Sequence, residues 1–161
     1  MHDGTALPDE HPFISRIPEF LRDLGVRVPT RLESSWAAVE GVRLHSRGSK
    51  TPLPNQSPFI LIHGLVISSL YMIPLAECLA IHHPVHALDL PGFGRSAAPE
   101  RVLSVAELAN AVIAWMDVCG IARCHLVGNS LGCEIAAHAA VKEPERIASL
   151  TLIGPTLDPD A

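Results

Sequence analysis

A five-residue segment flanked by glycines, Gly128 to Gly132, limits the possible folds of this chain more than any other feature. It follows the apolar run His125 to Val127 and precedes small and apolar residues from Leu131 to Val141, whose spacing predicts a helix. A strand that turns directly into a helix holds the residue at the turn in strained backbone angles. The residues two positions to either side must be small, so that strand and helix can pass closely, and both are glycine.

The residue at this turn is Ser130. A serine at a sharp strand-to-helix turn is the layout of a nucleophile elbow. A hydroxyl becomes an effective nucleophile only beside a base and beside donors that can receive an oxyanion. Ordinary loops also place serine between glycines, so other motifs in the sequence are needed to distinguish a catalytic from a structural interpretation.

Two more strands are predicted upstream, and each ends in a turn. Phe59 to Ile62 is an apolar run that ends in His63-Gly64. Val85 to Leu88 leads into the turn Asp89-Leu90-Pro91-Gly92-Phe93-Gly94-Arg95-Ser96. With these three motifs in this order, roughly residues 33 to 157 resemble the N-terminal half of an α/β-hydrolase.

Local patterns predict the remaining elements. Two strands, Ser34 to Val39 and Val42 to Ser46, flank Glu40-Gly41 and indicate a hairpin, and Ile147 to Ile153 is a further strand. One helix is expected from Leu70 to Ile81. Another begins at a capping box formed by Ser104 and Glu107, with Trp115 in its apolar stripe, and stops at Gly120.

Strands that alternate with helices predict an α/β fold with a mostly parallel twisted sheet, helices on both faces and a hairpin as its first strands. The resemblance implies that this fold is an incomplete α/β-hydrolase core. Ligands of such sheets bind at the carboxyl ends of the strands, where His63, Asp89 and Ser130 all fall. For Asp89 we expect a structural role, in which its loop shapes the pocket and does not react.

Ser130 is the predicted nucleophile, both from its position and from the resemblance. The resemblance implies that the backbone amides of Leu65 and Leu131 form an oxyanion hole. Relatives commonly have glycine at the position of Val66, and a β-branched residue tolerates positive φ poorly. If the loop requires positive φ there, Val66 would misplace its oxyanion donor. Residues expected to support the pocket or the elbow are His63, Gly64, Gly128, Asn129 and Gly132.

The histidine base of a serine hydrolase is not evident in the sequence. His138 lies eight residues along the helix after Ser130, ~12 Å away, and His125 lies five residues back along the strand, ~16 Å away. His63 is the one candidate that geometry allows, although the resemblance implies a structural role for it. Asp158 and Asp160 follow the last strand, where a minority of relatives place the triad acid.

Composition narrows the partners of the chain. Of its 161 residues, 48% are hydrophobic, the net charge is -5, and no cluster of Lys and Arg indicates nucleic acid or anionic membrane as a partner. Without a visible signal peptide or spanning segment, we expect a cytoplasmic protein that acts on a small molecule. No cofactor or metal is expected. The four cysteines lack metal or redox spacing and are predicted to be buried thiols: Cys78, Cys119, Cys124 and Cys133.

We expect residues 1–30 to form an N-terminal extension and residues 31–161 the first part of a truncated domain that lacks a cap and the last strands. Its final strand would be an exposed apolar edge, open to association. Two functions stay open. One is a serine hydrolase that cleaves an ester or an activated carbon–carbon bond through an acyl-serine. The other is a catalytically incomplete remnant that binds a small apolar ligand or a partner chain. A serine nucleophile argues against epoxide hydrolases and haloalkane dehalogenases, which need a carboxylate there.

Overall fold

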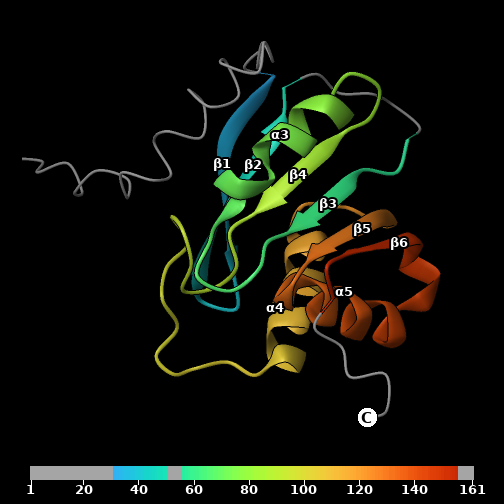
Figure 1. Ribbon diagram of the computed structural model, residues 1–161. Coiled ribbons are helices and arrows are strands. Elements are labelled where there is room, and N and C mark those ends of the chain that lie inside the picture. The colour runs from blue at the N-terminus through green and yellow to red at the C-terminus, as the bar shows by residue number, and fades with distance from the viewer. Residues whose placement is uncertain (1–30, 51–55, 156–161) are drawn as a thin grey trace, which may run out of the picture.

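Six strands form one sheet in the computed structural model, which describes residues 31–50 and 56–155 (Figure 1). Their order across the sheet is β1-β2-β4-β3-β5-β6. Strands β3 to β6 pair in parallel, whereas β1 pairs with β2 and β2 pairs with β4 antiparallel, so the predicted fold class is confirmed. The strands are β1 (Leu32–Val39), β2 (Val42–Ser49), β3 (Phe59–Ile62), β4 (Val85–Leu88), β5 (Cys124–Asn129) and β6 (Ile147–Ile153).

The first two strands form the predicted hairpin, with Glu40 and Gly41 at its tip. Both residues have positive φ, 48° and 84°, as a two-residue turn that matches the strand twist requires. Strand β2 runs to Ser49, three residues beyond the predicted end. The reason is tertiary, because Ser46 to Gly48 pair with β4 and this pairing keeps the strand extended.

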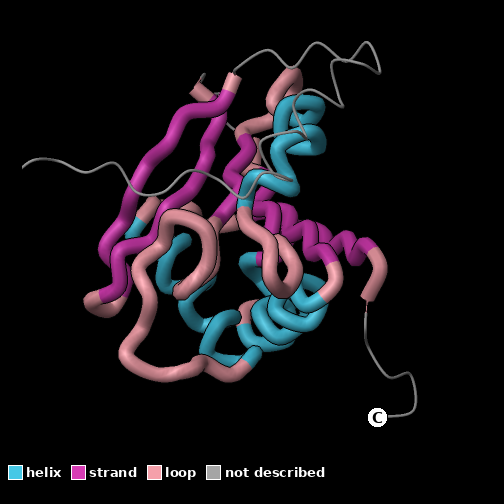
Figure 2. Tube along the Cα trace, turned by 60° about the vertical axis from the view of Figure 1, so that its left-hand side comes forward, coloured by secondary structure: helices cyan, strands magenta, loops and turns pink. Residues whose placement is uncertain are grey.

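Helices cover both faces of the sheet. Helix α3 (Ser69–Leu79) lies on one face, and α4 (Val105–Val118) and α5 (Leu131–Lys142) pack together on the other, as Figure 2 shows. A 3₁₀ turn, η1 (Pro144–Arg146), connects α5 to β6. The capping box predicted for α4 is present, since the hydroxyl and the amide of Ser104 both exchange hydrogen bonds with Glu107.

Apolar clusters fill the space on each side of the sheet. The larger cluster lies under α4 and α5 and includes Trp115, which is buried as predicted. The smaller cluster lies under α3. Cys124 and Cys133 are buried, but Cys78 and Cys119 are exposed, so the prediction that all four thiols are buried is wrong for these two. A helical pattern does not reveal which face of α3 is covered, and Cys119 lies at the exposed C-cap of α4.

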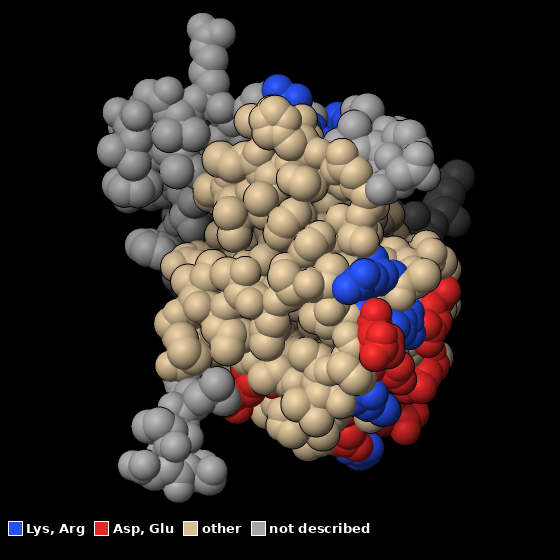
Figure 3. All heavy atoms as spheres, turned by 90° about the vertical axis from the view of Figure 1, so that its right-hand side faces the viewer, with Lys and Arg blue, Asp and Glu red and all other residues tan. Residues whose placement is uncertain are grey.

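Strand β6 is an edge of the sheet, paired with β5 alone in the described part of the chain. It has no charged residue, and Leu150 and Ile153 are both exposed. Figure 3 shows a broad uncharged area on this side of the molecule. No helix within residues 31–50 and 56–155 is long and apolar enough to cross a membrane. The extension predicted for residues 1–30 lies outside the described residues.

Candidate functional site

Ser130 lies between β5 and α5, at the carboxyl end of the parallel strands. Its backbone angles, φ 51° and ψ -121°, belong neither to a helix nor to a strand. Residues other than glycine adopt such angles only when their surroundings impose them, at a cost of about 1–3 kcal/mol. The turn predicted from the sequence therefore has the strained geometry of an elbow.

Backbone packing around the elbow explains its two glycines. A Cβ atom on Gly128 would collide with the backbone of Gly132, the second residue of α5. A Cβ atom on Gly132 would collide with the carbonyl oxygen of Ile62 at the end of β3. Strand β5, helix α5 and strand β3 thus meet at distances that only glycine permits, and this contact fixes the direction in which the elbow points.

The elbow is also tied to the end of β6. The carbonyl oxygen of Ile153 accepts hydrogen bonds from the amide of Ser130 at 3.0 Å, from the side chain of Asn129 at 3.5 Å and from the thiol of Cys133 at 3.4 Å. Three donors on one oxygen hold the turn against the neighbouring strand. Asn129 therefore has the position of a turn residue and a hydrogen-bond donor.

The loop after β3 passes next to the elbow. A Cβ atom on Gly64 would lie 3.1 Å from that of Ser130, so the two segments are in van der Waals contact. Val66 has a φ of 58°, and the loop adopts the positive-φ backbone despite its branched side chain, which is 87% exposed. Among the described residues, neither the amide of Leu65 nor that of Leu131, the first residue of α5, has a hydrogen-bond acceptor. Two donors without acceptors therefore border the serine.

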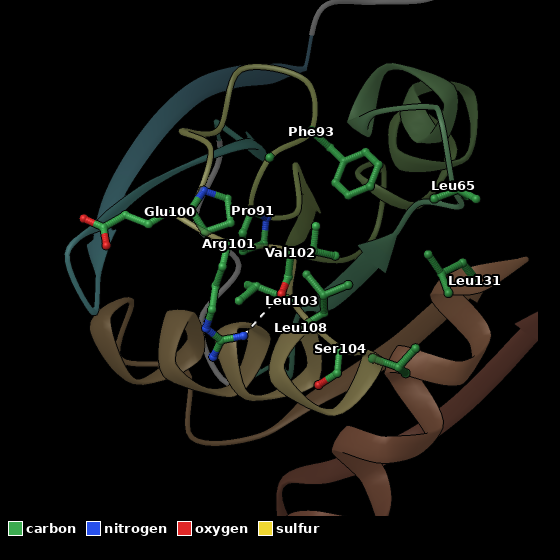
Figure 4. A pocket seen from close by; sticks show the side chains of 13 residues that line it. Leu65, Pro91, Phe93, Glu100, Arg101, Val102, Leu103, Ser104, Leu108 and Leu131 are labelled. Atoms are coloured by element: carbon green, nitrogen blue, oxygen red, sulfur yellow. Dashed lines mark hydrogen bonds between the residues drawn. The ribbon is translucent and has the colours of Figure 1, made fainter.

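A groove of about 740 Å³ begins at these two leucines. Figure 4 shows Leu65 and Leu131 at one end, and Glu100 and Arg101 at the other. Arg101 forms an ion pair with Glu107, which keeps the pKa of Glu107 at about 2 and leaves the pair ionised. Side chains between the two ends are mainly apolar: Pro91, Phe93, Val102, Leu103 and Leu108. The sequence motifs included Phe93 but gave no indication of the contribution from the start of α4.

His63 has a structural position. Its ring is fully buried, Nδ1 donates to the carbonyl of Gly64 at 2.7 Å, and Nε2 accepts from the amide of Leu90 at 3.2 Å. Burial lowers the pKa of His63, although the Gly64 hydrogen bond and the charge of Asp89 oppose this change, so the ring is neutral. With both nitrogens engaged, the ring joins the loop after β3 to the loop after β4 and has no lone pair for Ser130.

Asp89 organises the loop after β4. Its buried carboxylate accepts hydrogen bonds from Nδ1 of His45 at 2.7 Å, from the amide of Ser69 at 2.6 Å and from the amide of Arg95 at 3.0 Å. Burial alone would raise the pKa of Asp89, but these donors, His45 first, lower it to about 2. Sequence reasoning missed His45 and Ser69, since a histidine within a strand pattern gives no sign of a partner 44 residues away.

No histidine within residues 31–50 and 56–155 donates to or accepts from the Ser130 hydroxyl. The ring of His125 stacks on Phe59 and bonds to Ser149 at 2.7 Å, and His138 is exposed on α5. Asp158 and Asp160 lie outside the described residues. The same described ranges contain no group of three or more metal-ligating side chains that could hold an ion.

Comparison with known proteins decides the family. A family model described as alpha/beta hydrolase fold matches residues 57–161. The chain belongs to the α/β-hydrolase fold family. Among solved structures, a bacterial membrane phospholipase A superimposes with a TM-score of 0.75 at 29% identity, over 89% of this chain and 44% of that one.

Relatives in this hydrolase family include an esterase. The pimeloyl-acyl-carrier-protein methyl ester esterase of Aeromonas salmonicida is 35% identical over 95 residues, which is 58% of this chain and 36% of that protein. The dihydrolipoyllysine-residue acetyltransferase component of the acetoin cleaving system of Pseudomonas putida is 38% identical over 97 residues, 60% of this chain and 26% of that protein. The chain therefore spans well under half the length of these relatives.

Proposed function

We propose that this chain supplies the nucleophile and the oxyanion donors of a serine hydrolase that cleaves an ester, or an activated carbon–carbon bond, through an acyl-serine intermediate. One observation carries the proposal. Ser130 has strained angles at a strand-to-helix turn, beside two amides without acceptors. Because the family includes an esterase among the relatives of this chain, ester hydrolysis is the first reaction to test.

In the proposed reaction, Oγ of Ser130 attacks the substrate carbonyl, and the amides of Leu65 and Leu131 donate to the resulting oxyanion. Each such donor typically contributes about 10²–10³ in rate. The alcohol leaves, and water then releases the acid from the acyl-serine. The base and its acid have to come from outside the described residues, in this polypeptide or in another.

The groove supports an apolar, uncharged substrate. Its lining is mainly apolar, and the Arg101–Glu107 ion pair at its far end has no net charge. Glu100 adds a carboxylate there, which disfavours a substrate that ends in an acid group. A small ester with an aliphatic chain fits this chemistry.

A fluorophosphonate probe tests the nucleophile directly. We expect mass spectrometry of the labelled and digested protein to locate the probe on Ser130, and the Ser130→Ala variant to lose that modification. Replacing Ser149, which lies on the exposed strand β6, provides the matched control and should leave the labelling of Ser130 unchanged. Folded protein that is never modified at Ser130 would contradict the proposal.

The alternative is a catalytically incomplete member of the family that binds a small apolar ligand or a partner chain. The absence of a histidine beside Ser130 within the described ranges favours it, as does the uncharged edge strand β6. A titration with methyl octanoate, followed by ¹H–¹⁵N NMR, separates the two. Unhydrolysed ester that shifts the amide signals of Leu65 and Leu131, without modification of Ser130 by the probe, supports the binding function.

A further inference from the structure

A second serine, distant from the elbow in sequence, lies at the end of a row of hydrogen-bonded side chains. Nε2 of His45 is 3.0 Å from Oγ of Ser34, and Nδ1 of the same ring is 2.7 Å from Oδ2 of Asp89. Hydroxyl, imidazole and carboxylate follow one another in the order of a serine nucleophile, its base and the acid that orients the base. We propose that Ser34 is a second nucleophilic serine, with His45 as its base, that accepts acyl or phosphonyl groups from activated donors.

The hydrogen-bond network fixes where the protons are. The carboxylate of Asp89 also accepts from the amides of Ser69 and Arg95, so it is ionised and can only accept. Nδ1 of His45 must therefore have a proton to donate. In the neutral ring this leaves the lone pair on Nε2 facing Ser34, whose hydroxyl donates to it. The tautomer that a general base needs is thus imposed by Asp89.

The surroundings hold the ring in place, and the serine beside it is only half-buried. His45 is fully buried, and the ring of Trp36 packs against it with centroids 4.9 Å apart. Ser34 itself is half-buried on the edge strand β1. Its direct cross-strand partner on β2 is Arg47. A preoriented base and a half-buried hydroxyl therefore coincide in this network.

The reaction proceeds in one displacement. Oγ of Ser34 attacks the phosphorus of a fluorophosphonate, the O–P bond forms, and the P–F bond breaks with release of fluoride. The hydroxyl proton moves to Nε2 of His45 and from there to solvent, which restores the neutral ring. With an activated phenyl ester, the same steps form an acyl-serine and release the phenol, which receives that proton.

The chain contains a matched internal comparison. Ser149 also lies beside a histidine, with Oγ 2.7 Å from Nδ1 of His125. No carboxylate among the described residues bonds to the other nitrogen of that ring, which stacks on Phe59. Ser149 thus has a base without an acid to orient it, and Ser34 has both. The difference between the two serines isolates the contribution of Asp89.

The experiment treats the full 161-residue chain with an alkyl fluorophosphonate and quantifies modified peptides over time by tandem mass spectrometry. We expect Ser34 to be modified at least tenfold faster than Ser149, because positioned acid–base groups contribute about 10²–10⁴ in rate. The His45→Gln variant should slow modification of Ser34 at least tenfold, while His125→Gln leaves it unchanged. Ser35→Ala controls for the adjacent hydroxyl, which pairs with Ser46.

Equal rates at Ser34 and Ser149 in the unmutated chain would overturn the proposal, and this comparison requires no variant to fold. Loss of modification in Ser35→Ala with retention in Ser34→Ala would overturn it as well. Modification of Ser130 is read from a different peptide in the same digest. The nucleophile proposed at the elbow can therefore fail while Ser34 reacts, or the reverse, and each result is recognised separately.

Discussion

Replacing Asp89 with asparagine tests how far the shape of the site depends on one buried carboxylate. Asp89 is 1% exposed, and its two oxygens accept from the His45 ring and from the amides of Ser69 and Arg95. Asparagine offers a single acceptor oxygen, so its NH₂ group has to face at least one of these donors. The backbone amide that loses its acceptor is that of Ser69, at the start of α3, or that of Arg95, in the loop after β4. Each is a segment that borders the site.

Two overlapping contributions determine how much unfolding free energy the Asp89→Asn variant loses. Burial raises the pKa of Asp89, but its three donors outweigh burial and lower the pKa from 3.8 to about 2. At about 1.36 kcal/mol for each pKa unit, this favours the ionised folded state by roughly 2 kcal/mol. A buried donor without an acceptor costs about 1–3 kcal/mol. We expect Asp89→Asn to lower the free energy of unfolding by about 2–4 kcal/mol at pH 7.

The same reasoning predicts a pH dependence with a definite sign. The folded pKa lies below the unfolded value, so this stabilisation is complete above the unfolded pKa of 3.8 and is lost as the pH falls through about 2. The difference in unfolding free energy between the wild-type chain and Asp89→Asn should therefore be constant from neutral pH down to about pH 5 and shrink below it. Asparagine does not titrate, so the change belongs to the wild-type chain.

Urea unfolding, followed by circular dichroism at pH 7, 5 and 3, measures this difference. Asp117→Asn is the matched control, because Asp117 is 62% exposed and pairs with Arg146 at 2.7 Å on the surface. An exposed pair of this kind contributes about 0–1 kcal/mol, so the control should lose no more than that. Equal losses in the two variants, or a loss in Asp89→Asn that is the same at pH 7 and pH 3, would refute the role given to the carboxylate.

Three further predictions concern the elbow, its neighbouring loop and the thiols. Gly132→Ala should destabilise the protein by about 2 kcal/mol or more in urea unfolding, because its Cβ would collide with backbone; a loss below about 1 kcal/mol would contradict that packing. Val66→Gly should stabilise by about 1 kcal/mol, because it relieves a positive φ, whereas Val102→Gly, equally exposed, should not; similar effects would argue against strain at Val66. Iodoacetamide should modify exposed Cys78 well before Cys124, since burial raises the pKa of Cys124 to about 12, and peptide mapping that finds the opposite order would contradict this.

Local signals predicted the fold well because they coincide with tertiary structure in this chain. The runs Phe59 to Ile62 and Val85 to Leu88 are predicted and observed with identical bounds, since each fills one short buried strand. Helix α3 ends at Leu79, two residues before the predicted end, and β2 extends to Ser49. The extension of β2 arises from its pairing with β4, a segment distant in sequence about which a local pattern contains no information.

The candidate site was predictable to the extent that it depends on the backbone. The strain at Ser130 follows from the glycines on either side of it, and the amide of Leu131 has no helical partner because it opens α5. The row from Ser34 through His45 to Asp89 was not predictable. Its members come from three strands or strand ends, separated by 11 and 44 residues, and no spacing rule connects them. The resemblance rested on the motifs that follow β3 and β4 and on the elbow after β5, and none of these motifs includes Ser34 or His45.

A reactive serine needs both oxyanion donors and a base, and within the described residues each of the two serines has only one of these. Ser130 has a strained turn and two amides without acceptors, but no described imidazole; Ser34 has an imidazole and a carboxylate on a regular strand. A serine hydroxyl is a weak nucleophile at neutral pH unless a base removes its proton, so Ser34 should react first with a fluorophosphonate.

Free imidazole in the buffer distinguishes the two serines. At Ser130 it supplies the base that the described chain lacks, and the open groove beside Leu65 and Leu131 gives it access, so the rate of modification should rise with imidazole concentration. At Ser34 the hydroxyl already bonds to Nε2 of His45, so the rate should not change. N-methylated pyrazole, a ring of similar size but far lower basicity, is the control. Equal acceleration of both serines by imidazole would mean that neither has a positioned base.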